Sequence, residues 1–240
     1  MLSAGLNAVR TANGLVHIPE TRHQISYEVH GSLHSKRRVC LVIGFRGSFR
    51  LWDDVINHYI TSGPESDYAF LVIDNRGMGL STQGVFSPTG YTTRGMALDV
   101  AAVLEAVGWL DTPDNDSEPS DIPTMFPKDK AGRALKFHLM GISMGGMICL
   151  ELAAMIPDHL YSLTLLNTAA KMKSPPGQGG IKRVISEQLH APKSTQEVIE
   201  SIMDRWFAPG WKAQHDPHYP QFDTNADRFI GLMFANYQLK

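Results

Sequence analysis

The stretch Gly141-Ile142-Ser143-Met144-Gly145 decides the fold of this chain. It follows a short apolar run, 135–140, and leads directly into a helical pattern at 146–155. A sharp turn from a strand into a helix holds its serine in a strained backbone conformation, so only small residues fit two positions before and two positions after it. We therefore predict a nucleophile elbow with Ser143 at its apex. An ordinary strand-to-helix turn is the alternative.

Two earlier segments favour the elbow, because each joins a buried strand to a glycine-rich turn. In the first, the unbroken apolar run 39–43 opens into Gly44-Phe45-Arg46-Gly47-Ser48 and reaches Trp52 at the start of a helix. In the second, the run 70–73 ends in Asp74-Asn75-Arg76-Gly77-Met78-Gly79-Leu80-Ser81. Unbroken apolar runs of this length are typical of parallel strands that are buried on both faces.

Together the three segments resemble the α/β-hydrolase superfamily, in particular its serine esterases and lipases, over about 13–170. The first resembles the family's oxyanion loop, usually His-Gly-Phe-x-Gly-Ser-x-x-x-Trp, although Ile43 replaces the histidine. The second resembles its Asp-x-Arg-Gly-x-Gly-x-Ser turn. The resemblance implies an α/β fold: a mostly parallel sheet with helices on both faces and a partial helical cap.

The same resemblance assigns roles to individual residues. It implies that Ser143 is the nucleophile and that the backbone N–H groups of Phe45 and Met144 form the oxyanion hole. Arg46 is a candidate for binding an anionic group of the substrate, with a solvated loop arginine as the alternative. Trp206 is expected in the cap, either facing an apolar acyl pocket or packing structurally. No cofactor and no metal are implied.

Two further expectations concern residues around the nucleophile. The resemblance implies that Asp74 and Arg76 stabilise their turn through hydrogen bonds. Trp52 is expected to be a core anchor, and His138 to lie in the core of the elbow strand. The remaining candidate bases are expected to be surface or packing histidines: His159, on the face opposite the site, and His190, His215 and His218 in the cap region.

The catalytic acid and base are harder to place. The family's order is serine, then Asp or Glu, then histidine, with the last two following late strands. After Ser143 only one further strand is recognisable, 161–166, and it ends at Asn167, which cannot ionise. The region 171–240 is helical in pattern. We therefore expect that this chain lacks the last two strands, the triad acid and the triad histidine, and that the strand at Tyr161 leaves a sheet edge exposed.

These features predict a serine hydrolase that acts on a small-molecule ester or related acyl substrate. A serine at the elbow argues against epoxide hydrolases and dehalogenases, which use aspartate there. The alternative is a truncated or non-catalytic relative that acts as a binding or interaction module. A homo-oligomer in which a second subunit supplies the histidine remains open.

Composition limits the other classes of function. The chain has 240 residues, 43% of them hydrophobic, and a net charge of −2, so nothing favours nucleic acid or an anionic membrane as a partner. No run of 18 apolar residues is present, so no membrane span is expected. Cys40 and Cys149 are expected to be core thiols, which fits a reducing compartment such as the cytoplasm.

The expected organisation has three parts. Residues 1–12 form a tail, 13–170 the core, and 171–240 the truncated cap region. The core begins with a hairpin of 14–18 and 24–30 and contains an amphipathic helix at 92–107. Residues 111–134 are acidic and rich in proline, which predicts a solvated insertion.

Overall fold

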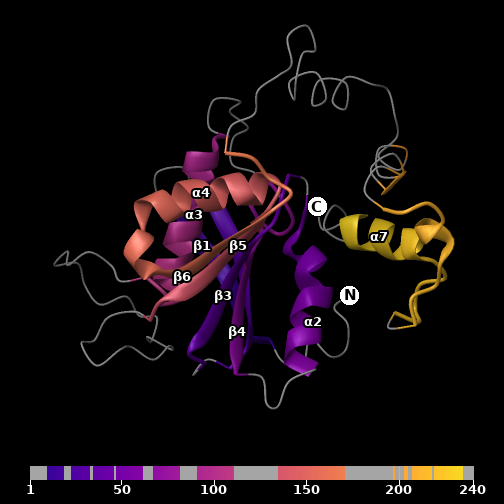
Figure 1. Ribbon diagram of the computed structural model, residues 1–240, viewed down its shortest axis with the longest axis horizontal. Helices are drawn as coiled ribbons and strands as arrows, with labels where there is room; N and C mark the ends of the chain where they lie inside the picture. Colours follow the sequence, from indigo (N-terminus) through magenta and orange to yellow (C-terminus); the bar gives the residue numbers. More distant parts are fainter. Residues whose placement is uncertain are drawn as a thin grey trace, which may run out of the picture. The chain divides into compact units, whose positions relative to one another are not determined.

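The computed structural model divides the chain into two compact units, Leu2–Ala169 and Ala170–Lys240. We describe each unit by itself (Figure 1). The structure describes residues 10–18, 23–32, 35–45, 47–61, 67–81, 91–110, 135–170, 197, 200, 203–204, 207–217 and 219–234. The predicted insertion at 111–134 lies outside these residues.

The first unit is built on a six-stranded sheet with the order β1-β2-β4-β3-β5-β6. β1 and β2 form the predicted antiparallel hairpin, and β2 pairs antiparallel with β4. The pairs β3–β4, β3–β5 and β5–β6 are parallel, which confirms the mostly parallel sheet. The strands are β1 (Arg10–Ile18), β2 (His23–Gly31), β3 (Arg37–Val42), β4 (Tyr68–Ile73), β5 (Phe137–Ile142) and β6 (Leu160–Leu166).

β1 begins earlier than the sequence pattern indicated. It starts at Arg10 instead of Gly14, and its register with β2 shifts between Arg10 and Ala12. The extension has no β-branched run to reveal it. The Thr11 hydroxyl donates to the Val29 carbonyl oxygen at 3.2 Å, and the Arg10 guanidinium pairs with a carboxylate on β2. Contacts with the neighbouring strand therefore extend β1 beyond the local pattern.

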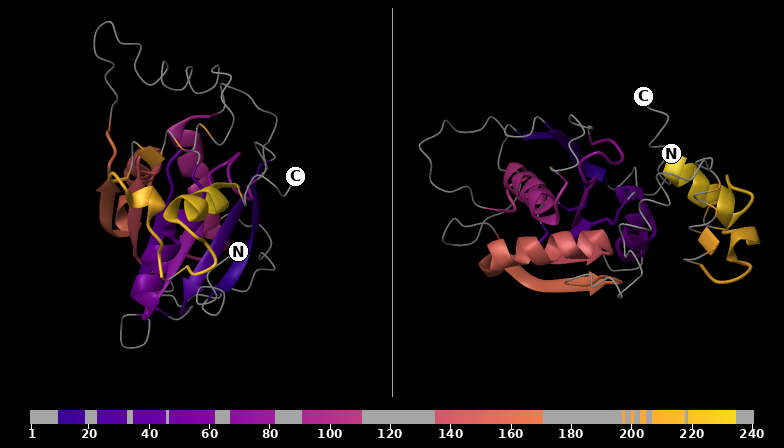
Figure 2. Two further views of the ribbon diagram at one scale, coloured as in Figure 1. Left: turned by 90° about the vertical axis from the view of Figure 1, so that its right-hand side faces the viewer. Right: turned by 90° about the horizontal axis from the view of Figure 1, so that it is seen from above.

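Helices cover both faces of the sheet, as predicted (Figure 1). On one face lie α3 (Thr93–Ala106) and α4 (Met144–Met155), and Figure 2, seen from above, shows α4 running alongside β6. On the other face lie the short 3₁₀ helix η1 (Phe49–Trp52) and α2 (Asp53–Thr61).

The side chains of β3 and of Ile43, the residue that follows it, alternate between two apolar clusters. Cys40 and Val42 pack on the side of α3 and α4, whereas Leu41 and Ile43 pack with Trp52. All five are buried, and alternate side chains of a strand point to opposite faces. The unbroken apolar run therefore marks a strand buried on both sides, and Trp52 is the core anchor that was expected.

α3 confirms the helix predicted at 92–107. The Thr92 hydroxyl caps its start by accepting a hydrogen bond from the Gly95 N–H at 3.0 Å. Gly108, with φ of 70°, follows its end in the left-handed conformation that glycine adopts without strain. The buried face of α3 consists of Met96, Ala97, Asp99, Val100, Val103 and Leu104.

β6 is the last strand of the sheet in the part of the chain that the structure describes. Its outer edge has no strand partner among those residues. Tyr161 is 60% exposed, and Leu165 and Leu166 are also exposed. The exposed edge expected at Tyr161 is therefore present in the described part of the first unit.

The regular secondary structure described in the second unit is helical, and turns and irregular chain connect it. It contains η3 (Trp211–Ala213) and α7 (Asn225–Phe234). The rings of Phe207 and Trp211 stack at 3.7 Å between centroids, and Phe229 meets the Phe207 ring edge-on at 5.3 Å. An aromatic cluster thus stabilises this unit. In neither unit does a described helix have both the length and the apolar character that a bilayer crossing requires.

Candidate active site

The site lies where the order of the parallel strands reverses. β4 and β5 flank β3 on opposite sides, and Val42 near the end of β3 pairs with Gly141 near the end of β5. Such a switch point opens a crevice beyond the carboxyl ends of the strands, which is where open α/β sheets bind their ligands. The loop after β3 and the turn after β5 therefore face the same space.

Ser143 has the strained backbone that the sequence predicted. Its φ is 54° and its ψ is −123°, and it is one of two residues other than glycine with positive φ among the described residues. The Ser143 N–H donates to the Leu166 carbonyl oxygen at 2.9 Å, and α4 begins at the next residue. Strained conformations of this kind persist only when the surrounding structure enforces them, and they gather at functional sites.

The two flanking glycines are sterically required. A Cβ added to Gly145 would lie 2.3 Å from the Val42 carbonyl oxygen, and one added to Gly141 would lie 2.5 Å from the Gly145 carbonyl oxygen and 2.6 Å from Cys149 Sγ. These distances are far below van der Waals contact. The steric reason for the small residues around Ser143 is confirmed, and Cys149 is buried beneath the turn, as expected.

The loop after β3 approaches Ser143 closely. A Cβ added to Gly44 would lie 3.1 Å from Ser143 Cβ and 3.7 Å from Ser143 Oγ. The Gly47 N–H donates to the Gly44 carbonyl oxygen at 3.2 Å and closes the loop into a turn. Phe45 follows Gly44, and 39% of this residue is exposed. The structure therefore brings the segment that contains Phe45 next to the serine.

The start of α4 adds a favourable electrostatic environment. The first N–H groups of a helix have no acceptor within the helix, and they carry partial positive charge. Met144 is the first residue of α4 and follows Ser143 directly. An oxygen that becomes negative beside Ser143 would thus meet the positive end of a helix.

Asp74 connects the loop after β3 with the turn after β4. It is fully buried, and its two carboxylate oxygens accept hydrogen bonds from the N–H groups of Phe49 at 2.8 Å and Leu80 at 2.9 Å. Burial raises the pKa of Asp74 to about 6, although these hydrogen bonds oppose the shift. The neighbouring Asn75 amide donates to the Ile43 carbonyl oxygen at 2.8 Å. Asp74 therefore stabilises the turn, as expected.

Arg76 stabilises the same turn from the side of α3. Its guanidinium forms two hydrogen bonds with the buried Asp99 carboxylate, at 2.6 and 2.7 Å. It also donates to the Gly95 carbonyl oxygen at 2.9 Å. A bidentate pair of this kind fixes geometry as well as charge. The expectation that Arg76 is a structural arginine is confirmed.

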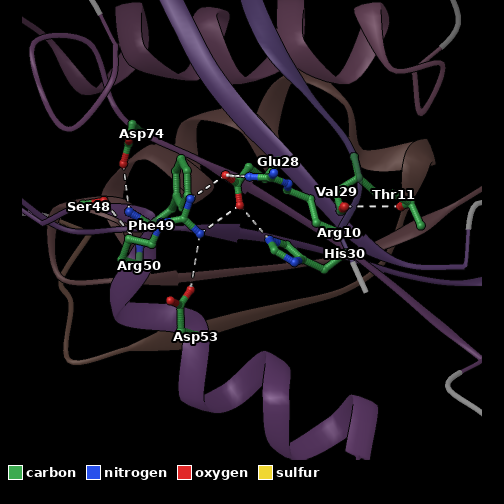
Figure 3. A network of polar contacts seen from close by, with 10 residues as sticks. All are labelled: Arg10, Thr11, Glu28, Val29, His30, Ser48, Phe49, Arg50, Asp53 and Asp74. Carbon is green, nitrogen blue, oxygen red and sulfur yellow. Dashed lines mark hydrogen bonds and ion pairs between the residues drawn. The ribbon is translucent and has the colours of Figure 1, made fainter. Parts of the chain in front are cut away.

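A buried charge network is connected through Arg50 of η1 to the loop after β3 (Figure 3). The sequence analysis did not predict this network. Glu28 on β2 pairs with Arg50 of η1 at 2.5 and 2.9 Å, with His30 at 3.0 Å and with Arg10 at 3.2 Å. Burial alone would raise the pKa of Glu28, but hydrogen bonds and charge from His30 and Arg50 lower it to about 2. Polar residues two apart in a buried strand, Glu28 and His30, were the available signal.

The candidate histidines are separate from Ser143. His138 was expected in the core, but it is half-buried, and its Nδ1 lies 2.8 Å from the Ser162 hydroxyl, because the β5–β6 register places the two side chains together. His159 precedes β6 and so lies at the opposite end of the strand from the site, as expected. In the second unit, His215 Nδ1 lies 3.1 Å from the Phe222 carbonyl oxygen.

Four of the predicted residues lie outside the described residues: Arg46, Trp206, His190 and His218. Within the described ranges, no histidine or carboxylate is hydrogen-bonded to the Ser143 hydroxyl. The structure thus brings together Ser143, the start of α4 and the loop after β3.

Comparisons with known proteins agree with this fold. A family model described as "alpha/beta hydrolase fold" matches residues 133–192. A protein of Variovorax paradoxus named carbamate hydrolase RutD is 28% identical over 191 residues, which are 80% of this chain and 59% of that protein. A protein of the same name from Pseudomonas syringae is 30% identical over 142 residues, 59% of this chain and 42% of that protein. The matches thus span about half the length of these relatives.

Solved structures share the architecture. A hydrolase from Pseudomonas aeruginosa superposes with a TM-score of 0.61 at 20% identity, over 94% of this chain and 72% of that one. A structure from a study of carboxylesterases of the thaumarchaeon Nitrososphaera gargensis gives a TM-score of 0.57 at 16% identity, over 95% and 73% of the two chains. At these identities the likeness establishes the fold alone.

Proposed function

Because the chain belongs to the α/β-hydrolase superfamily, we propose that it is a serine hydrolase that cleaves ester or related acyl bonds with Ser143 as its nucleophile. The observation that carries the proposal is the backbone of Ser143. Its φ of 54°, directly before α4 and beside the Gly44 loop, is a strained arrangement of the kind that gathers at functional sites.

The proposed reaction is acyl transfer. Ser143 Oγ attacks the substrate carbonyl carbon, its proton passes to a general base, and the carbonyl oxygen becomes an oxyanion. The N–H groups of Met144 and Phe45 are the proposed oxyanion donors, each worth about 2.7–4 kcal/mol in transition-state stabilisation. Collapse of the intermediate releases the alcohol or amine, and water then hydrolyses the acyl-serine. We assign the base to none of the described residues.

The substrate class remains broad. The names of the Variovorax and Pseudomonas relatives add carbamates to the esters suggested by the sequence, and a carbamate carbonyl is attacked by the same chemistry. Arg46, which follows Phe45 in the chain, remains a proposed site for an anionic substrate group. Trp206 remains a proposed wall of an acyl pocket, in a cap formed by 171–240.

Turnover of model substrates tests the proposal. p-Nitrophenyl acetate, p-nitrophenyl butyrate and an alkyl carbamate are incubated with the 240-residue chain and with Ser143→Ala. We expect Ser143→Ala to lower kcat by about 1,000-fold or more, as loss of a nucleophile does in serine hydrolases. Ser162→Ala is the matched control, because Ser162 lies on β6 and is not part of the proposed site. This variant should retain wild-type turnover.

The outcome also decides the alternative. Equal background rates for a folded wild-type chain and Ser143→Ala would contradict the proposal and favour a binding module with a hydrolase fold. Turnover per chain that falls on dilution would indicate a homo-oligomer in which a second subunit supplies the base.

A further inference from the structure

One side-chain hydrogen bond reaches the strained peptide of the elbow. The Thr168 hydroxyl donates to the Ser143 carbonyl oxygen at 2.6 Å, across 25 residues of sequence. The same oxygen accepts the N–H groups of Gly146 at 3.0 Å and Met147 at 3.3 Å as α4 begins. Three donors therefore converge on this carbonyl, and Thr168 is the one that comes from outside the helix.

That carbonyl belongs to the peptide unit that also carries the Met144 N–H. A peptide unit is planar and trans, so its C=O and N–H point in opposite directions as one rigid body. Fixing the Ser143 oxygen therefore fixes the direction of the Met144 N–H on the other side. A hydrogen bond to the carbonyl also polarises the unit, which strengthens its N–H as a donor.

The position of Thr168 is itself well determined. Asn167 turns the chain after β6 with φ of 43°, and the preceding Leu166 carbonyl accepts the Ser143 N–H at 2.9 Å. The Thr168 methyl fills the space above Gly146, where an added Cβ would lie 2.5 Å from Thr168 Cγ2. The end of β6 thus fixes both the N–H and the C=O of Ser143.

We propose that Thr168 is a positioning residue that aims the Met144 N–H at the reacting oxygen by holding the Ser143 carbonyl from behind. The inference rests on the proposed function for its effect on catalysis. The role of Thr168 in orienting the peptide unit between Ser143 and Met144 does not depend on that function.

Two substitutions separate the hydroxyl from the methyl group. Thr168→Val keeps the shape and removes the hydroxyl, and Thr168→Ser keeps the hydroxyl and removes the methyl. With p-nitrophenyl acetate we expect Thr168→Val to lower kcat about fivefold, the factor that corresponds to one hydrogen bond, with KM unchanged. The effect should fall on kcat because the oxyanion forms only in the transition state. Thr168→Ser should keep most of the wild-type kcat, because it retains the hydroxyl that donates to the Ser143 carbonyl oxygen.

A spectroscopic measurement makes the test independent of turnover. The ¹⁵N and ¹H chemical shifts of the Met144 amide should move in Thr168→Val and return towards the wild-type values in Thr168→Ser. An unchanged Met144 resonance in Thr168→Val would overturn the inference, and so would a Thr168→Ser variant that behaves like Thr168→Val. If the wild-type chain shows no Ser143-dependent turnover, the proposed function fails, and the Met144 resonance still decides the role of Thr168.

Discussion

The elbow and the loop after β3 each carry one proposed oxyanion donor, but the protein holds them by different means. The hydrogen bonds of Ser143 use backbone groups and one hydroxyl, and glycines at 141 and 145 let the chains approach. The loop after β3 depends on buried side chains instead: Asp74 accepts the Phe49 N–H, and Glu28 pairs with Arg50.

The elbow is held by steric exclusion and neutral hydrogen bonds, whereas the loop is held by buried charged side chains. Steric exclusion and neutral hydrogen bonds do not change with pH, so the elbow should keep its shape wherever the protein is folded. Buried carboxylates titrate, and their contribution to folding changes with pH. The loop should therefore be the part of the site that responds to acid, and each prediction below tests one side of this comparison.

The largest effect is expected from Gly145→Ala, on the steric side. The new Cβ would lie 2.3 and 2.5 Å from the carbonyl oxygens of Val42 and Ile43, which are backbone atoms at the end of the central strand β3 and cannot rotate away. We expect a loss of about 3 kcal/mol or more in the free energy of unfolding. Urea unfolding monitored by tryptophan fluorescence would measure it.

Gly108→Ala is the matched control for this substitution. Gly108 has φ of 70°, but an added Cβ would meet no atom within 4 Å. Its cost should be limited to the backbone strain of about 1–2 kcal/mol. If Gly145→Ala were no more destabilising than Gly108→Ala, packing against β3 would not be what shapes the elbow.

The next effect concerns the loop and its dependence on pH. Because the folded protein binds the Asp74 proton more tightly than the unfolded chain, with a pKa of about 6 against 3.8, the free energy of unfolding should rise as pH falls from about 6 to 4. At 1.36 kcal/mol per pKa unit the gain from this carboxyl is about 3 kcal/mol. Asp74→Asn should abolish it, as measured by urea unfolding between pH 4 and 7.

Glu28→Gln is the control of opposite sign. The pKa of Glu28 is lowered from 4.5 to about 2, so its stabilisation is present above pH 4.5 and is lost as pH falls towards 2. Glu28→Gln should cost about 3 kcal/mol at pH 7 and flatten the profile below pH 4.5, because Arg50 loses the nearer of its two carboxylate partners, Glu28 and Asp53. If the free energy of unfolding of Asp74→Asn and of Glu28→Gln changed with pH in the same way, the opposite pKa shifts of Asp74 and Glu28 would be refuted.

The sequence predicted the elbow side of the site better than the loop side, and the reason is physical. The small residues of the elbow lie within five positions of one another, so the glycines at 141 and 145 reveal the turn, although the atom that Gly145 must avoid belongs to Val42 on β3. The Glu28–Arg50 pair joins residues 22 apart, and Thr168 reaches Ser143 across 25. Such partners depend on strand register and loop path, which no local pattern encodes.

The smallest change in stability is expected from Gly44→Ala. Gly44 lies where the loop after β3 meets the elbow, so this variant is also the most direct test of the comparison between them. The new Cβ would lie 3.1 Å from Ser143 Cβ and 3.2 Å from the Ile142 carbonyl oxygen, so the loop must retreat by a few tenths of an ångström. We expect a loss of about 1 kcal/mol in stability. We expect kcat/KM for p-nitrophenyl acetate to fall about tenfold, because small displacements of reacting groups are costly.

Gly14→Ala shows whether that loss is specific to the site. Its Cβ would meet the Tyr27 ring at 3.1 Å, the same distance, but within the β1–β2 hairpin. The two variants should therefore lose similar stability, and only Gly44→Ala should lose activity. Wild-type kcat/KM in Gly44→Ala would mean that the loop and the elbow do not act on the same oxygen, and the Phe45 donor would have to be abandoned while the Met144 donor stood.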